Sequence, residues 1–220
     1  MSRVTGLPEN QWPEDLRAGA AKLKRPDPRY EATGILARLP DIARALGALT
    51  VATKSGTLSA RLLELTRLRM AFHNQCRSCM AIRYSTAKAD GVDEGLVCSL
   101  EKPAEAPDLT DAERAAIDFC DRFATDHLSI DETVYDGLRQ NFTEDEIVQL
   151  GCHAALCVGV GRLHATGHSM KICPNPSRQR TKPPSPPGPP RRSKWSDGTA
   201  RSEAALGQPV TWSGAWLMSI

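Results

Sequence analysis

The sequence predicts an all-α fold, a helical bundle. From Tyr30 to about Ser169 the apolar residues recur at helical spacing, and the apolar–polar alternation typical of strands is nearly absent. Threonine, asparagine and aspartate residues with helix-capping spacing punctuate this stretch. A chain of 220 residues, 40% hydrophobic and 25% charged, is large enough to bury a core between such helices.

The first predicted helices lead up to a pair of cysteines. Residues 14–24 allow one short helix between prolines, and residues 58–72 carry leucines along one side, as a core-facing helix does. Asn74 is expected to cap a helix that runs to about Asp90, where Gly91 supplies a left-handed stop.

The later helices are marked by their caps. Thr110 and Glu113 form a predicted capping box that opens a helix to about residue 127, and Asp131 is expected to cap a shorter one. Thr143 with Glu146 opens a last helix that reaches roughly residue 167. Prolines enforce a loop over residues 100–109.

Three regions follow from this pattern. Residues 1–30 form an N-terminal arm, residues 31–169 the helical domain, and residues 170–220 a basic, Pro-rich tail. The run KPPSPPGPPRR in this tail favours extended polyproline structure, and we expect the tail to be disordered.

Composition excludes several classes of protein. No apolar run approaches the length of a membrane helix, and the first residues lack the apolar stretch of a secretion signal, so we expect a cytoplasmic protein with no membrane partner. The eight basic residues after residue 170 outnumber two acidic ones, which leaves a mildly acidic body. That body has no basic stripe interleaved with aromatic residues, so no nucleic-acid partner is expected.

The sharpest chemical signal is the pair Cys76 and Cys79, at the predicted start of a helix. Two thiols at this spacing on one helical turn lie close enough to form a disulfide. Unpaired N–H groups and the positive end of the helix dipole favour a thiolate over a thiol there. The pair therefore predicts redox chemistry.

Three further side chains are placed to assist these thiols. Arg83 follows Cys79 by four residues, so on a continuous helix its charge lies one turn away and lowers the pKa of the thiol. Glu64 returns alongside the cysteines as a proton acceptor or donor if its helix packs antiparallel to theirs. His73 is the other titratable group close to the pair in sequence.

Around these residues the chain resembles the carboxymuconolactone decarboxylase family, and within it the alkyl hydroperoxidase D (AhpD)-like branch. The resemblance spans roughly residues 35–167. It rests above all on a glutamate, eleven intervening residues and a CxxC motif, in the segment ELTRLRMAFHNQCRSC. It implies an all-helical homo-oligomer, a trimer or hexamer, that reduces hydroperoxides or disulfides.

The resemblance also implies roles for the residues. Cys79 is the thiolate that attacks the peroxide, Cys76 resolves the sulfenic acid, and Glu64 relays protons. A dithiol, such as a lipoylated protein, restores the thiols, and no cofactor is required. The family has a histidine where this chain has Arg83, and a guanidinium is effectively never deprotonated. Proton delivery is then expected from Glu64 through a water, or from His73.

Other interpretations remain open at this point. Glu64 can instead pair with Arg67 on its own helix. Cys76 and Cys79 can be half of a zinc site, although we expect no metal. Its further ligands would be Cys152, His153 and Cys157, or His164 and His168, on a helix whose apolar character favours core packing.

These observations predict a peroxiredoxin-type oxidoreductase, a thiol-dependent peroxidase or disulfide reductase. One alternative is an enzyme of the carboxymuconolactone decarboxylase type, a reaction that does not call for a CxxC pair. The other is a non-catalytic oligomeric module whose tail recruits partners.

Overall fold

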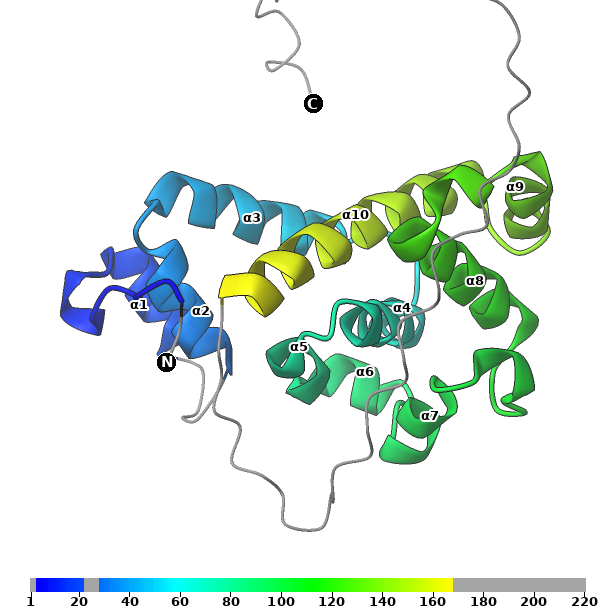
Figure 1. The fold of residues 1–220 in the computed structure, drawn as a ribbon, viewed down its shortest axis with the longest axis horizontal. Coiled ribbons are helices and arrows are strands. Elements are labelled where there is room, and N and C mark those ends of the chain that lie inside the picture. Colours follow the sequence, from blue (N-terminus) through cyan, green and yellow to red (C-terminus); the bar gives the residue numbers. More distant parts are fainter. Residues whose placement is uncertain (1–2, 22–27, 168–220) are drawn as a thin grey trace, which may run out of the picture. The chain divides into compact units, whose positions relative to one another are not determined.

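Every regular element in the part of the chain that the structure describes is a helix, which confirms the predicted all-α fold (Figure 1). The computed structural model describes residues 3–21 and 28–167. The predicted tail, residues 170–220, lies outside these ranges.

Helix α4 (Ala60–His73) is the centre of the domain, as the leucine pattern of residues 58–72 predicted. Ser59 caps it by accepting a hydrogen bond from the Leu62 amide. Nine of its fourteen residues are buried, because it packs against α8 (Asp111–Thr125), α10 (Glu144–Gly167) and the short helices that follow it. In Figure 1, α4 is seen nearly end-on, with α10 above it and α8 to its right.

The single helix predicted over residues 74–90 is wrong. The chain forms two short helices there, α5 (Arg77–Ala81) and α6 (Ser85–Ala89), separated by extended backbone at Ile82 and Tyr84. Asn74 is not an N-cap either, because it continues the right-handed conformation at the end of α4. The turn to α5 is made by Gln75, whose φ of 51° lies in the left-handed region.

The predicted stop at Gly91 is confirmed by its φ of 84°. Helix α7 (Glu94–Ser99), capped by Asp93, follows it. The proline-containing loop after α7 holds one 3₁₀ turn, η2 (Pro103–Glu105).

The predicted caps of the later helices are all confirmed. Thr110 and Glu113 exchange the two hydrogen bonds of a capping box at the start of α8. Asp131 caps α9 (Glu132–Arg139), and Thr143 and Glu146 make the corresponding bonds before α10. Helix α8 ends slightly earlier than predicted and is followed by the 3₁₀ turn η3 (His127–Ser129).

The N-terminal elements are η1 (Glu9–Gln11), α1 (Glu14–Ala20), α2 (Pro28–Leu36) and α3 (Pro40–Ala52). Trp12, Ala20 and Ala37 form a smaller core cluster there. The indole of Trp12 is buried and donates to the Leu7 carbonyl over 2.7 Å. Helix α3 has no buried residue, and four apolar side chains on it or beside it are exposed: Leu39, Ile42, Leu49 and Val51.

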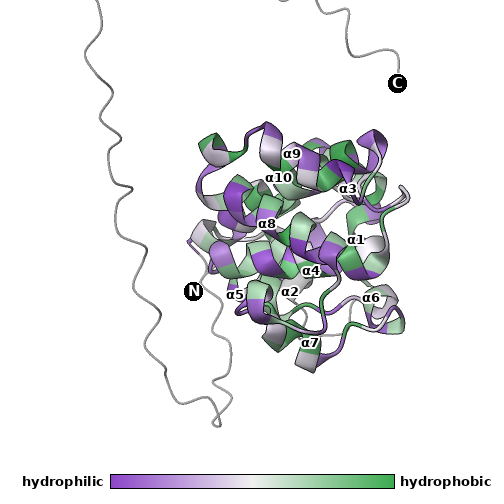
Figure 2. Cartoon of the chain, turned by 90° about the vertical axis from the view of Figure 1, so that its right-hand side faces the viewer, coloured by the Kyte–Doolittle hydropathy of each residue, from purple (hydrophilic) through white to green (hydrophobic). Residues whose placement is uncertain are grey.

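Hydropathy varies along and around the helices, and Figure 2 shows hydrophobic and hydrophilic residues alternating on the same elements. Within the described ranges, no helix combines the length and the apolar character needed to span a bilayer.

Candidate redox site

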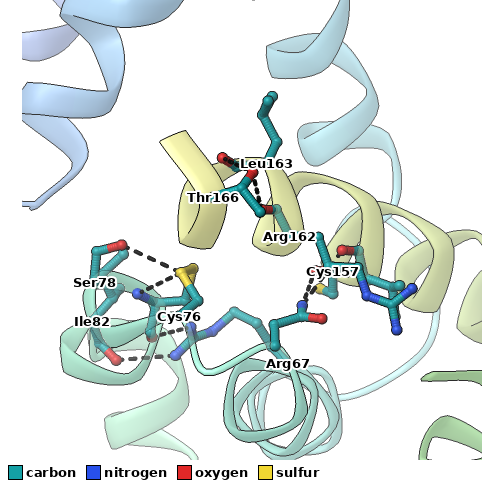
Figure 3. The surroundings of a disulfide bond; sticks show 11 residues. Arg67, Cys76, Ser78, Ile82, Cys157, Arg162, Leu163 and Thr166 are labelled. Carbon is teal, nitrogen blue, oxygen red and sulfur yellow. Dashed lines mark hydrogen bonds between the residues drawn. A yellow bond between two sulfur atoms is a disulfide. The ribbon is translucent and has the colours of Figure 1, made fainter. Parts of the chain in front are cut away.

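The site is built on α5, the short helix directly after α4. Cys76 is its N-cap and Cys79 lies within it, and the two form a disulfide (Figure 3). The predicted CxxC pair is thus in bonding contact. In Figure 3 the disulfide lies between α5 and the end of α10, where Arg162, Leu163 and Thr166 are labelled.

The two sulfurs have different surroundings. Cys76 is 1% exposed, and its Sγ lies 3.3 Å from both the Cys79 amide and the Ser78 hydroxyl. Cys79 is half-buried and lines a cavity. After reduction of the disulfide the first-turn amide can therefore stabilise a Cys76 thiolate, whereas Cys79 is the sulfur that a small molecule can reach.

A buried ion pair holds α5 against α4. The Arg67 guanidinium binds both oxygens of Glu64 at 2.7 and 2.8 Å, and both side chains are buried. It also donates to the carbonyl oxygens of Cys79, at 2.7 Å, and Ile82, at 3.0 Å. Burial alone would lower the pKa of Arg67, but the Glu64 carboxylate raises it. Glu64 thus pairs with Arg67 on its own helix, and Arg67 connects it to the cysteine helix.

Arg83 does not take the predicted position beside Cys79. Since α5 ends before Ile82, no continuous helix carries Arg83 back to the sulfur. Its guanidinium instead forms a bidentate ion pair with Glu94 at 2.9 and 3.1 Å, and donates to the Met80 and Ile82 carbonyls. Arg83 satisfies backbone groups at the end of α5.

His73 points to α8. Its Nε2 lies 2.7 Å from Asp121, which also receives two hydrogen bonds from Arg69. Burial raises the pKa of Asp121, but the bonds from His73 and Arg69 outweigh it, so this pKa is lowered. The structure therefore places His73 in an ion-pair cluster between α4 and α8 and not beside the cysteines.

A cavity of about 440 Å³ opens beside Cys79, between α2, α3, α5 and α10. Much of its lining is small or aliphatic: Ala32, Leu36, Ala43, Leu46, Gly47, Ala71, Ile82, Leu156 and Val160. Its polar part comes from Thr33, Thr50, Thr53, Lys54, Arg67, Asn74, Ser78, Tyr84, His153, Cys157 and His164. The site can therefore accommodate an apolar molecule whose reactive end reaches a sulfur.

Two of these polar residues, His153 and Cys157, lie one turn apart on α10. His153 is 2% exposed, and its Nε2 lies 3.0 Å from the Leu63 carbonyl and 3.6 Å from the Cys157 sulfur. Burial, assisted by Lys54 and Arg67 and opposed by the Leu63 carbonyl, lowers the pKa of His153 to about 4. Burial likewise raises the pKa of Cys157 to about 11. Both side chains are neutral near pH 7.

Sequence reasoning considered His153 and Cys157 only as metal ligands or core residues. Among the described residues no three His, Cys, Asp or Glu side chains are grouped to hold a metal ion. His168, the remaining residue of the alternative ligand set, lies outside these residues. Lys54 and Asn74 carried no sequence signal for the cavity, because they reach it from the ends of α3 and α4 through tertiary packing.

Comparison with known proteins agrees with the predicted resemblance. Residues 40–121 match the model of the carboxymuconolactone decarboxylase family, a range that contains Glu64, Cys76 and Cys79. A comparison with curated proteins finds no match.

Solved structures share the fold at low sequence identity. A peroxidase-related protein of uncharacterised function from Ralstonia eutropha JMP134, with an alkylhydroperoxidase AhpD core, is 20% identical over 74% of this chain and 87% of its own, with a TM-score of 0.64. A protein of unknown function from Agrobacterium tumefaciens, described as a candidate antioxidant defence protein AhpD, is 23% identical over 61% and 93%, with a TM-score of 0.56.

The debrominase Bmp8 is 20% identical over 60% of this chain and 71% of its own, with a TM-score of 0.53. The predicted resemblance is thereby confirmed: residues 40–121 carry the carboxymuconolactone decarboxylase family pattern, and the domain around them has the AhpD-like fold.

Proposed function

We propose that the protein is a thiol-dependent peroxidase or disulfide reductase that cycles between the Cys76–Cys79 disulfide and the dithiol. One observation carries the proposal: the disulfide presents Cys79 to a largely apolar cavity and keeps Cys76 buried behind it. An attacking thiolate must be accessible, whereas a resolving one needs only to reach its partner.

The steps balance with the residues at hand. The Cys79 thiolate attacks the terminal oxygen of a hydroperoxide, so an S–O bond forms, the O–O bond breaks and the alkoxide leaves as an alcohol after taking a proton. The Cys76 thiolate then attacks the sulfur of the Cys79 sulfenic acid, which releases water and forms the disulfide. The two thiol protons supply both products, and an external dithiol, such as a lipoylated protein, returns two electrons and two protons.

The Glu64–Arg67 pair supports this cycle by holding the cysteine helix in place. Arg67 fixes the carbonyls of Cys79 and Ile82, and so holds the orientation of α5 against α4. Glu64 keeps the guanidinium charged in the interior. A second, smaller cavity lined by Glu64 has room for a water near this carboxylate, which would begin the proton route. Arg67, Tyr84 and His153 line both this cavity and the one that holds Cys79.

Stopped-flow measurement of cumene hydroperoxide consumption by the pre-reduced protein tests the proposal. We expect fast consumption with loss of two thiols per chain. Cys79→Ser should abolish it, and Cys76→Ser should allow one turnover that ends at a sulfenic acid. Cys98→Ser is the matched control, since Cys98 is a free, exposed cysteine on α7. Hydroperoxide consumption at the rate of an ordinary free thiol would refute the peroxidase activity. The disulfide reductase activity is then tested by measuring whether the dithiol form reduces a small disulfide.

A further inference from the structure

Two of the residues that line the cavity beside Cys79 each hold a buried hydrogen-bond acceptor. The first is Nδ1 of His153. Because the Leu63 carbonyl can only accept, the His153 Nε2 at 3.0 Å must carry the ring proton and donate it. A neutral ring has one proton, so Nδ1 is a bare acceptor, and this atom is buried without a hydrogen-bond partner.

The second acceptor is Oδ1 of Asn74. The amide nitrogen of Asn74 donates to the carbonyls of Cys157, at 3.0 Å, and Val158, at 3.4 Å. These two bonds fix which way the amide points, since its oxygen cannot replace its nitrogen opposite a carbonyl. Its Oδ1 is likewise buried without a partner. Asn74 is thus held by backbone carbonyls of α10, and His153, which lies on α10, is held by the Leu63 carbonyl of α4.

Buried polar atoms without partners are rare, because each loses its bonds to water and gains none in return. Two on residues that line one cavity indicate that bound molecules complete them. Each is an acceptor, so a ligand that completes one must bring a donor, and a water can serve the other. The aliphatic side chains that line the remainder of the cavity favour an apolar body.

The positive side chains at the cavity indicate which kind of hydrogen-bond donor the ligand carries. Lys54 and Arg67 also line the cavity, and both lower the pKa of His153. A ligand ammonium group would meet the charge of Lys54, and the Glu64 carboxylate that could attract it is already paired with Arg67, whereas a neutral hydroxyl meets no such repulsion. The favoured donor is thus an uncharged O–H group.

We propose that His153 Nδ1 accepts the one hydrogen bond that the O–H group of an apolar hydroperoxide or alcohol can donate when it is bound beside Cys79, and that Asn74 Oδ1 takes its hydrogen bond from a water. His153 is a positioning residue, which orients the terminal oxygen without exchanging electrons. For the hydroperoxide this inference rests on the proposed function, but binding of the alcohol requires no redox chemistry.

Binding of 2-phenyl-2-propanol and of its methyl ether to the oxidised protein tests the inference. The two molecules share an apolar body, and only the alcohol donates a hydrogen bond. We expect isothermal titration calorimetry to give at least tenfold tighter binding of the alcohol. Since the oxidised protein does not turn over, this result is independent of the peroxidase assay, and either can fail while the other succeeds.

Substitution of His153 tests whether the preference for the alcohol depends on its ring nitrogen. His153→Phe should reduce this preference to less than threefold, and His153→Leu replaces it if the phenylalanine variant does not fold. Thr50→Val is the matched control, because Thr50 lines the same cavity but its hydroxyl already donates to the Leu46 carbonyl. That variant should keep the full preference.

Three results would overturn the inference. They are equal binding of alcohol and ether to the unmodified protein, binding of neither at millimolar concentration, and an unchanged preference in a folded His153 variant. The first would mean that water satisfies the two acceptors, and the second that the cavity binds no such molecule.

Discussion

The guanidinium of Arg67 donates a 2.7 Å hydrogen bond to the carbonyl oxygen of Cys79, and so joins the central helix to the redox helix. The same group neutralises the buried Glu64 carboxylate. Arg67→Met should therefore destabilise the protein by about 3–5 kcal/mol, because an unpaired charge is left in the interior. Urea unfolding followed by circular dichroism measures the loss.

The double variant Glu64→Gln, Arg67→Met separates the charge from the packing. It removes the stranded carboxylate, so it should recover part of the stability lost in the single variant. If the double variant is no more stable than Arg67→Met, the loss comes from the α5 carbonyls and not from Glu64.

Arg83 should have little influence on thiol acidity. Its guanidinium is paired with Glu94 and with backbone carbonyls, so Arg83→Met should shift the pKa of the Cys79 thiol by less than about 0.5. The thiolate absorbance of the reduced Cys76→Ser variant, titrated with and without the Arg83 change, provides the measurement. A rise of a full unit or more would show that Arg83 acts on the thiolate after all.

Asn74 packs so closely on α10 that one glycine is required there. A Cβ at Gly161 would lie 2.3 Å from the Asn74 amide nitrogen, whereas a Cβ at Gly159 would meet nothing within 4 Å. Gly161→Ala should cost about 1–3 kcal/mol by displacing Asn74. Gly159→Ala should stabilise the helix by up to about 1 kcal/mol. Thermal melting of both variants checks the contrast, and equal effects would contradict it.

The exposed apolar residues of α3 make it the expected interface of the homo-oligomer that the family resemblance implies. Ile42 is 51% exposed, and no residue of α3 is buried. We expect Ile42→Asp to shift the protein towards the monomer in size-exclusion chromatography with light scattering. Leu128→Asp, at an 85% exposed position in η3, is the control and should not. A monomeric unmodified protein would rule the interface out.

The sequence predicted those parts of the fold that depend on local signals. Thr110, Asp131 and Thr143 mark helix starts because a cap is made within three residues, and Gly91 marks a stop because few residues adopt its φ. The break at Ile82 could not be predicted in this way. Its carbonyl accepts hydrogen bonds from the adjacent Arg83 and from Arg67, fifteen residues earlier, so one of the partners that make a short helix possible is tertiary.

The same distinction holds for the candidate site: features set by nearby residues were predicted, and those set by tertiary packing were not. Cys76 and Cys79 are bonded as their spacing indicated, and Glu64 lies on the preceding helix. Arg83 was misplaced because a continuous helix was assumed, and His73 because it is close to the cysteines in sequence. Each side chain binds a carboxylate elsewhere. His153 was missed as a cavity residue because its role depends on α10 crossing α4, 90 residues from its Leu63 partner.

The buried His153 should make the protein less stable in mild acid. Its pKa of about 4 in the folded state lies below the value of about 6.5 expected for the unfolded chain, so the unfolded state binds the proton more readily between these values. Its stabilising contribution is complete above about pH 6.5 and falls as the pH approaches 4, with a total loss of about 3 kcal/mol.

The groups around the His153 ring keep its pKa lowered throughout the range from pH 6.5 to 4. Lys54 and Arg67 remain positive, Glu64 is neutralised by its ion pair with Arg67, and the Cys157 thiol, with a pKa of about 11, stays uncharged. Urea unfolding between pH 5 and 7 measures how the free energy of unfolding changes with pH, in a range above that in which most carboxylates titrate. His153→Phe should flatten the curve in this window. A slope that is unchanged in the folded variant would assign the acid sensitivity to another group.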